Sequence, residues 1–177
     1  MTHAQVEQQA APENKKYELL TTDTMKSWDG RTLYRIRALA AIAAIGVAAG
    51  DLGGYVEAET NLQVSGDAWV YGNARVFGDA RVYGNARVYG DARVSLNIHF
   101  GWMVHVGSEN GTLTWYRAAA GIQVNRGCFY GTLDEFESAV SKTHGDNQSA
   151  KEYRCLIDFI KLRSSSWVNE EAKQEAA

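Results

Sequence analysis

Histidine and cysteine are the side chains of this sequence best suited to chemistry near neutral pH, and their spacing limits what that chemistry would be. His99 and His105 lie six residues apart, whereas His144 lies far along the chain. One histidine could act as a general base, and three could hold a zinc ion. Cys128 and Cys155 show no CxxC spacing, and Cys128 has no histidine or lysine beside it in sequence. We expect both thiols to be buried in packing.

Binding is favoured over catalysis by the motifs of the chain. The sequence contains no P-loop, GxGxxG, HExxH or nucleophile elbow. We therefore expect no catalytic residue, no cofactor and no metal. Aromatic and arginine side chains recur instead in and beside the stretch VYGNARVFGDARVYGNARVYGDARV, and these residue types are enriched at protein interfaces. The predicted partner-binding residues are Trp69, Tyr71, Arg75, Phe77, Arg81, Tyr83, Arg87, Tyr89 and Arg93.

This stretch repeats every six residues, and the period continues beyond its visible ends. Steps of six from the aliphatic position meet the apolar residues Leu52, Ala58, Val64, Val70, Val76, Val82, Val88, Val94 and Phe100. Steps of six from the small position, four residues later, meet Val56, Leu62, Ala68, Ala74, Ala80, Ala86, Ala92, Ile98 and Val104. The sequence therefore predicts nine hexads over residues 52–105. Glycine at the third position suits a corner.

A six-residue period with apolar first and fifth positions resembles the hexapeptide-repeat proteins. The resemblance implies that each hexad makes one side of a triangular coil and that three hexads make one coil. The predicted fold is mainly β: a left-handed parallel β-helix of about three coils, with a C-terminal α+β cap made of a hairpin or meander and two helices. Stacked coils would bury valine and alanine that no single hexad can bury alone.

If three hexads make a coil, residues 18 apart stack at a strand spacing of about 4.8 Å. Asparagine and aspartate then alternate down each fourth-position column, as in Asn73 over Asp91, which keeps carboxylates out of register. The second and sixth positions are expected to face outward. The expected stacks at the sixth position are Glu57 on Arg75, Arg75 on Arg93, and Trp69 on Arg87.

Two enzyme types among the hexapeptide-repeat proteins remain alternatives. Many members are trimeric acyltransferases with a catalytic histidine in the groove between neighbouring helices, and a related carbonic anhydrase holds zinc with three histidines. Here His99 and His105 fall on adjacent faces of the predicted triangle, and no extended loop interrupts the hexads to build a substrate pocket. The pattern of three zinc-binding histidines is not established either.

The segments around the repeat divide the chain into further parts. Residues 1–16 are predicted to be a disordered lead, 17–51 strands and a cap, 106–163 an α+β domain, and 164–177 a flexible tail. The apolar run over 39–50 is expected to be a buried element of the cap. An Asn-Gly turn at 110–111 predicts a hairpin, and Thr132 with Glu135 predicts a capping box that opens the first of two helices.

Charge and hydropathy restrict the partner and the compartment. The net charge of −3 provides no basic field for a nucleic-acid backbone. The run over 39–50 is too short to span a bilayer. Two cysteines without a disulfide framework favour a reducing compartment. We expect a cytoplasmic protein with neither a membrane nor a nucleic acid as its partner.

Longer phrases carry a closer resemblance. NKKYELL, WDGRTLYRIRAL, AGDLGGYVEAETNL, GDAWVYGNARVFGDARVYG and GCFYGTLDEFESAVSKTHGDN…YRCLIDFIKLR occur in this order. They are similar to a group of small phage and prophage proteins that are often labelled polymer-forming or hypothetical. The alanine-rich run departs from this pattern, because such proteins carry charged residues there.

The resemblance implies a bacteriophage accessory protein. The leading hypothesis is a non-enzymatic protein that binds and inhibits a host protein, such as a component of a CRISPR–Cas defence system. One alternative is a structural or scaffold homo-oligomer of the phage. Another is a sponge that holds a nucleotide between subunits. The chain is expected to form a homo-oligomer, a dimer or a trimer, whereas the scaffold alternative would form long assemblies or associate with the virion.

Overall fold

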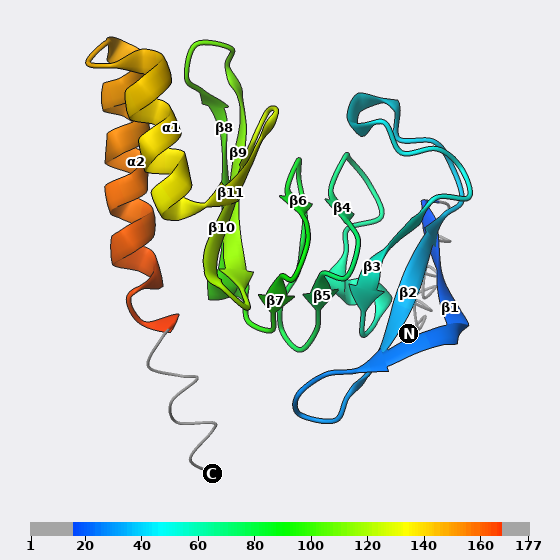
Figure 1. The fold of residues 1–177 in the computed structure, drawn as a ribbon. Coiled ribbons are helices and arrows are strands. Elements are labelled where there is room, and N and C mark those ends of the chain that lie inside the picture. The colour runs from blue at the N-terminus through cyan, green and yellow to red at the C-terminus, as the bar shows by residue number, and fades with distance from the viewer. Residues whose placement is uncertain (1–15, 168–177) are drawn as a thin grey trace, which may run out of the picture.

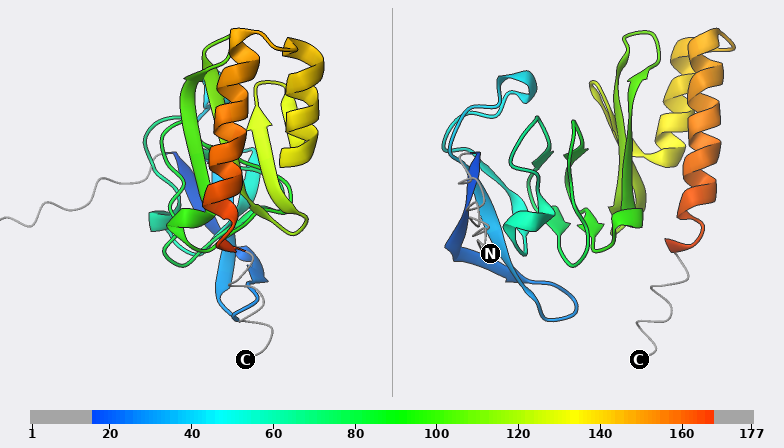
Figure 2. Two further views of the ribbon diagram at one scale, coloured as in Figure 1. Left: turned by 90° about the vertical axis from the view of Figure 1, so that its left-hand side faces the viewer. Right: turned by 180° about the vertical axis from the view of Figure 1, so that it is seen from behind.

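The computed structural model describes residues 16–167, so the predicted lead over 1–15 and most of the predicted tail, 168–177, lie outside the described residues. The chain is mainly β with two helices near its C-terminus, as the sequence predicts. Its elements follow one another in chain order along the molecule (Figure 1). An antiparallel hairpin lies at one end, the short strands of the repeat lie in the middle, and a four-stranded sheet with the helix pair lies at the other end (Figure 2).

Short parallel strands form the repeat, and its apolar positions make a buried column. The strands are β3 (Leu52–Val56), β4 (Trp69–Val70), β5 (Arg75–Val76), β6 (Arg87–Val88) and β7 (Arg93–Val94). β4 pairs with β6 and β5 pairs with β7, each over a step of 18 residues, as predicted. The first- and fifth-position residues between 68 and 94 are at most 1% exposed, so the hexad pattern is confirmed there.

The first part of the repeat has a different register from the one that steps of six predict. Val56 lies beside Val76, and Leu62 bridges to Val82, which is a step of 20 residues in both cases. Eight residues rather than six separate Leu62 from Val70. Every position before this two-residue insertion is therefore displaced by two, and Val56 and Leu62 fill the buried first position instead of the fifth.

Two predictions about this part are wrong as a result. Leu52 and Val64, which were expected in the buried column, are 56% and 39% exposed. Tyr55, rather than Glu57, lies beside Arg75. The predicted Glu57–Arg75 stack is therefore replaced by a tyrosine–arginine pair.

The repeat also ends earlier than predicted. Phe100 is the last buried first-position residue, and it begins β8 (Phe100–Val106). β8 pairs antiparallel with β9 (Gly111–Ala118) instead of continuing the parallel stack. Val104 and His105, assigned to the ninth hexad, are exposed on β8.

Side-chain hydroxyl groups of β9 cover the end of the repeat. The N–H of Tyr89 donates to the hydroxyl of Tyr116 at 3.0 Å, and the N–H of Arg87 donates to the hydroxyl of Thr114 at 3.4 Å. Eighteen residues earlier, the N–H groups of Trp69 and Tyr71 donate instead to the backbone carbonyls of Ala86 and Val88. Unpaired backbone N–H groups at the edge of a sheet can pair with another chain and cause aggregation. By accepting these hydrogen bonds, the two hydroxyls prevent such pairing at β6.

The hairpin of β1 (Tyr17–Lys26) and β2 (Thr32–Ala38) covers the opposite end, and its turn lies at Trp28–Gly30. β2 also pairs antiparallel with β3. Tyr17 is buried, and its hydroxyl donates to the carbonyl of Leu62 at 2.6 Å. Both ends of the stacked strands are thus covered by other parts of the chain.

The alanine-rich run over 39–50 is a mostly exposed excursion, so the prediction of a buried element is wrong. A single 3-10 turn, Ala43–Ile45, forms its tip. Only Ile42 and Val47 are buried, and they form an isolated bridge. Alanine and glycine offer little apolar area, so two larger side chains are enough to anchor the run.

Lys16, which falls at the end of the predicted lead, is buried against the start of the repeat. Its Nζ donates to the carbonyl oxygens of Gln63 at 3.0 Å and Ala68 at 2.6 Å. Burial lowers the pKa of this ammonium from 10.5 to about 8, although the charge of Asp67 opposes the shift. The repeat therefore holds a lysine that loses its proton more easily in the folded chain than in the unfolded chain.

We expect the free energy of unfolding to rise between pH 8 and pH 10. In this range the unfolded chain keeps a proton on Lys16 that the folded chain has released, so stability increases with pH by about 2 kcal/mol. Above pH 10 stability should fall, because burial raises the pKa of Tyr71 and Tyr116 above their usual value of 10.0. Urea unfolding at a series of pH values measures this maximum. Lys16→Met should flatten the rise below pH 10 and keep the fall above it, whereas equal slopes in both chains would contradict this assignment.

The C-terminal sheet runs in the order β11–β10–β9–β8, so β10 (Gly121–Arg126) and β11 (Phe129–Thr132) extend the predicted hairpin to a four-stranded sheet. The helices α1 (Leu133–His144) and α2 (Gln148–Ser164) cover its outer side (Figure 1). The predicted capping box is present: Thr132 Oγ1 accepts from the N–H of Glu135 at 3.2 Å, and Glu135 Oε2 accepts from the N–H of Thr132 at 2.7 Å.

Both cysteines are exposed, so the prediction that they are buried is wrong. Cys128 lies in the turn between β10 and β11, and Cys155 lies on the outer side of α2. Trp167 supplies buried area just beyond α2 and is 3% exposed. Within residues 16–167, neither helix combines the length and hydropathy needed to cross a membrane.

Candidate functional site: the arginine–tyrosine surface of the repeat

The nine predicted partner-binding residues divide into buried and accessible ones. Trp69 and Phe77 are each 1% exposed, so the prediction that they face solvent is wrong. Tyr17 covers Trp69 in an edge-to-face arrangement with ring centroids 6.3 Å apart. Phe77 packs with Leu33 and Tyr55. The other seven residues are exposed or partly exposed. They form the arginine–tyrosine surface of the repeat: Tyr71, Arg75, Arg81, Tyr83, Arg87, Tyr89 and Arg93.

Four arginines of this surface have no acidic partner within the described part of the chain. No hydrogen bond or ion pair joins the guanidinium groups of Arg75, Arg81, Arg87 and Arg93 to residues 16–167. Each lies at the sixth position of a hexad, directly before a buried valine. The hydrogen bonds between stacked strands fix the backbone that carries them.

The arginines of the N-terminal hairpin are different, because each has a carboxylate partner. Arg31 pairs with Asp29 and Glu57, Arg35 pairs with Asp23, and Arg37 pairs with Glu18. Sequence alone does not separate these arginines from those of the repeat. The repeat is thus a part of the described chain in which guanidinium groups remain available to an external acid.

Arg75 and Arg93 show this most clearly. They are paired in register on β5 and β7, as predicted. Like charges directly opposite one another on adjacent strands destabilise a sheet. An anionic group from a partner could bridge both guanidinium groups and relieve the repulsion.

The repeat also carries two clusters of aromatic side chains. Tyr71 and Tyr89 stack with centroids 4.1 Å apart and an interplanar angle of 5°, as their 18-residue spacing predicts. Tyr130, from β11, lies 5.8 Å from the ring of Tyr89. On a neighbouring face, the rings of Tyr83 and Trp102, from β8, are nearly perpendicular, with centroids 4.2 Å apart. Sequence reasoning missed both added aromatics, because Tyr130 comes from the unpredicted strand β11 and Trp102 was assigned to the ninth hexad, which is part of β8 instead.

Glycine makes room for these aromatics at the third position of two hexads. A Cβ at Gly90 would lie 2.2 Å from the hydroxyl of Tyr130, and a Cβ at Gly84 would lie 3.2 Å from Trp102. Both glycines have φ values above +60°. The corner glycine therefore supplies both an unusual backbone conformation and space for a ring, and only the first of these was predicted.

The histidines do not form a common site. His99 is buried, and its Nδ1 lies 3.3 Å from the N–H of Leu96 as an acceptor. His105 is exposed with a φ of 58°, and His144 lies beside Tyr153 at the end of α1. Among residues 16–167, no group of three or more histidine, cysteine, aspartate or glutamate side chains is placed to hold a metal ion.

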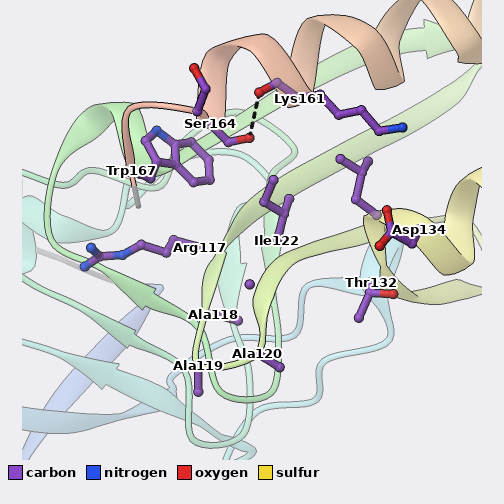
Figure 3. A pocket seen from close by; sticks show the side chains of 13 residues that line it. Arg117, Ala118, Ala119, Ala120, Ile122, Thr132, Asp134, Lys161, Ser164 and Trp167 are labelled. Carbon is purple, nitrogen blue, oxygen red and sulfur yellow. Dashed lines mark hydrogen bonds between the residues drawn. The ribbon is translucent and has the colours of Figure 1, made fainter. Parts of the chain in front are cut away.

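A cavity of about 450 Å³ opens between the β9–β10 turn and the two ends of the helix pair (Figure 3). Thr132 and Asp134 line one side, and Ser164 and Trp167 line the other. Ser164 donates to the carbonyl of Ile160 at 2.7 Å, so its hydroxyl is used within α2. This cavity lies at the border of the described residues and brings together none of the predicted binding residues.

One family model matches the repeat. Residues 68–84 and 80–96 are similar to the YdcK Beta solenoid repeat. The matched residues include the hexads whose 18-residue register the structure confirms. No curated protein matches the chain. The comparison thus supports a β-solenoid repeat in the middle of the molecule.

Proposed function

We propose that this chain is a phage-encoded, non-enzymatic protein that binds and inhibits a host protein through the arginine–tyrosine surface of its repeat. The observation that carries the proposal is the set of four repeat arginines without an acidic partner in residues 16–167. The host protein would be a component of an antiviral defence system, such as CRISPR–Cas. The phage origin and the defence role rest on the resemblance of the longer phrases.

The chemistry of the surface favours a protein partner with an acidic patch. The net charge of the chain is −3, which disfavours the long-range attraction of a nucleic-acid backbone. Arginine and tyrosine together fit the composition of protein interfaces, where guanidinium groups meet carboxylates and rings supply apolar area. Because the strands fix the backbone of these side chains, little ordering cost accompanies association.

The proposal includes a finer description of the fold. The repeat is a left-handed parallel β-helix of about three coils, and its accessible sides carry the binding residues. The hairpin at one end and β9 at the other cover the stacked strands. These covers disfavour end-to-end stacking of copies, so a binding role is preferred to a filament-forming scaffold.

Capture from host lysate combined with plaque assays tests the proposal. The control variant carries glutamine at positions 75, 81, 87 and 93, which removes four charges and keeps polar side chains of similar length. We expect the natural chain to retain one host protein and to restore phage plating on a defence-positive host. The variant should bind that protein at least about 100-fold more weakly, because charged interface contacts are worth several kcal/mol. Equal plating with and without the natural chain on every host would overturn the inhibitory role.

A further inference from the structure

A second cavity, of about 360 Å³, lies at the tip of the C-terminal sheet, away from the repeat. The β8–β9 turn, the β10–β11 turn and the two helices enclose it. Phe129, Phe136 and Val140 provide apolar walls, and Arg126 provides a charge. Cavities that hold small ligands combine such walls with a few polar groups, and this volume falls in their usual range.

The guanidinium of Arg126 is buried without a closely bound counter-ion. Its side chain is 8% exposed, and its ion-pair partner within residues 16–167, Glu109 Oε2, lies as far as 3.9 Å from Nη1. The side chain of Glu109 is 82% exposed, so water competes for this carboxylate. Nη2 donates to the carbonyl of Val106 at 2.8 Å, whereas Nε has no acceptor within residues 16–167. A buried charge with weak compensation is costly unless an anion joins it.

Packing holds this guanidinium in one place. The ring of Tyr153 lies 5.9 Å from its central carbon. Gly111 lies directly against it, since a Cβ there would come within 2.5 Å of Nη1. A fixed guanidinium loses little freedom when it forms paired hydrogen bonds with a carboxylate.

We propose that this cavity binds the carboxylate of a small molecule whose body is apolar. The carboxylate pairs with Arg126, and the apolar body lies against Phe129, Phe136 and Val140. Glu109 then turns fully into solvent. This site is separate from the arginine–tyrosine surface, so it does not depend on the proposed function.

Protection of Cys128 from alkylation tests the site. Cys128 lines the cavity, whereas Cys155 lies on α2 outside it and serves as an internal control. Phenylacetate is the probe, and phenylacetamide is its uncharged counterpart. We expect phenylacetate to slow the reaction of Cys128 with iodoacetamide and to leave Cys155 unchanged. Phenylacetamide should need about a tenfold higher concentration for the same protection, because it cannot form the charged pair.

Two variants separate a binding role from a structural role of Arg126. Arg126→Lys keeps the charge but loses the planar fork, so protection should require about tenfold more phenylacetate. Glu109→Gln removes the competing carboxylate and should tighten binding about twofold to threefold. Near-ultraviolet circular dichroism checks that each variant is folded. Equal protection by acid and amide, or no effect of phenylacetate on the natural folded chain, would overturn the proposal.

Discussion

The variant Gly54→Ala is expected to lose about 3 kcal/mol or more of the free energy of unfolding, although it adds a single methyl group. Gly54 is buried in β3, the first strand of the repeat, which lies directly against residues 70–74. A Cβ there would lie 2.6 Å from the carbonyl oxygen of Ala74 and 2.6 Å from Cγ1 of Val70. The carbonyl belongs to the backbone directly before β5 and accepts a hydrogen bond from the N–H of Tyr55 at 2.8 Å, so it cannot rotate away without loss. Urea unfolding followed by far-ultraviolet circular dichroism measures the loss.

Gly72→Ala is the matched control. Gly72 has a φ of 59°, and a Cβ there would meet no atom within 4 Å. Its cost is therefore only that of placing alanine in a left-handed conformation, about 1 kcal/mol. A loss at Gly54 no larger than the loss at Gly72 would show that β3 does not approach its neighbour as closely as described.

The sequence predicts the part of the repeat after Trp69 better than the part before it, which includes Gly54. Where each hexad has its full set of Val, Gly, Asn or Asp, Ala and Arg, the pattern repeats without interruption. The stacking partner of each residue is then the residue 18 positions later. Before Trp69 the insertion of two residues leaves apolar residues at both possible registers. Val56 and Leu62 are apolar, but so are Leu52 and Val64. Only pairing with the next strand decides which of these sets is buried.

The sequence predicts which side chains of the repeat point outward, but not which of them other parts of the chain cover. The alternation of a strand correctly places Arg75, Arg87 and Arg93 on the outer side of the stack, because their neighbours in sequence are buried. The same rule fails for Trp69 and Phe77, which other parts of the chain cover. An outward position in a repeat therefore indicates accessibility only where no flanking element folds over it.

Whether an arginine of the described chain has an acidic partner depends on which residues the fold brings beside it. Arg35 and Arg75 are indistinguishable by type, and both lie in strands. Asp23 from the facing strand pairs with Arg35, whereas the residue in register with Arg75 on β7 is another arginine. The pairing register therefore separates a structural arginine from a candidate binding arginine.

The variant Arg75→Glu is expected to stabilise the fold and to weaken binding of the proposed host protein. Arg75 lies in register with Arg93, so a glutamate at position 75 would replace a repulsive pair with an attractive one. Cross-strand charge pairs are worth about 0.2–1 kcal/mol, and a stability gain of that order should appear in urea unfolding. The same change would place a negative charge against the acidic patch proposed for the partner. Binding of the captured protein, measured by surface plasmon resonance, should weaken at least about 100-fold.

Arg37→Glu is the charge-matched control, because it changes the net charge equally on the N-terminal hairpin. Arg37 pairs with Glu18, so this variant should lose a little stability and retain binding. Combining Arg75→Glu with Arg93→Glu should remove the stability gain, since two carboxylates would then lie in register. Weakened binding in Arg37→Glu to the same degree as in Arg75→Glu would indicate that net charge, rather than the arginine–tyrosine surface, controls association. A loss of stability in Arg75→Glu would instead mean that Arg75 stabilises the repeat through contacts other than its pairing with Arg93.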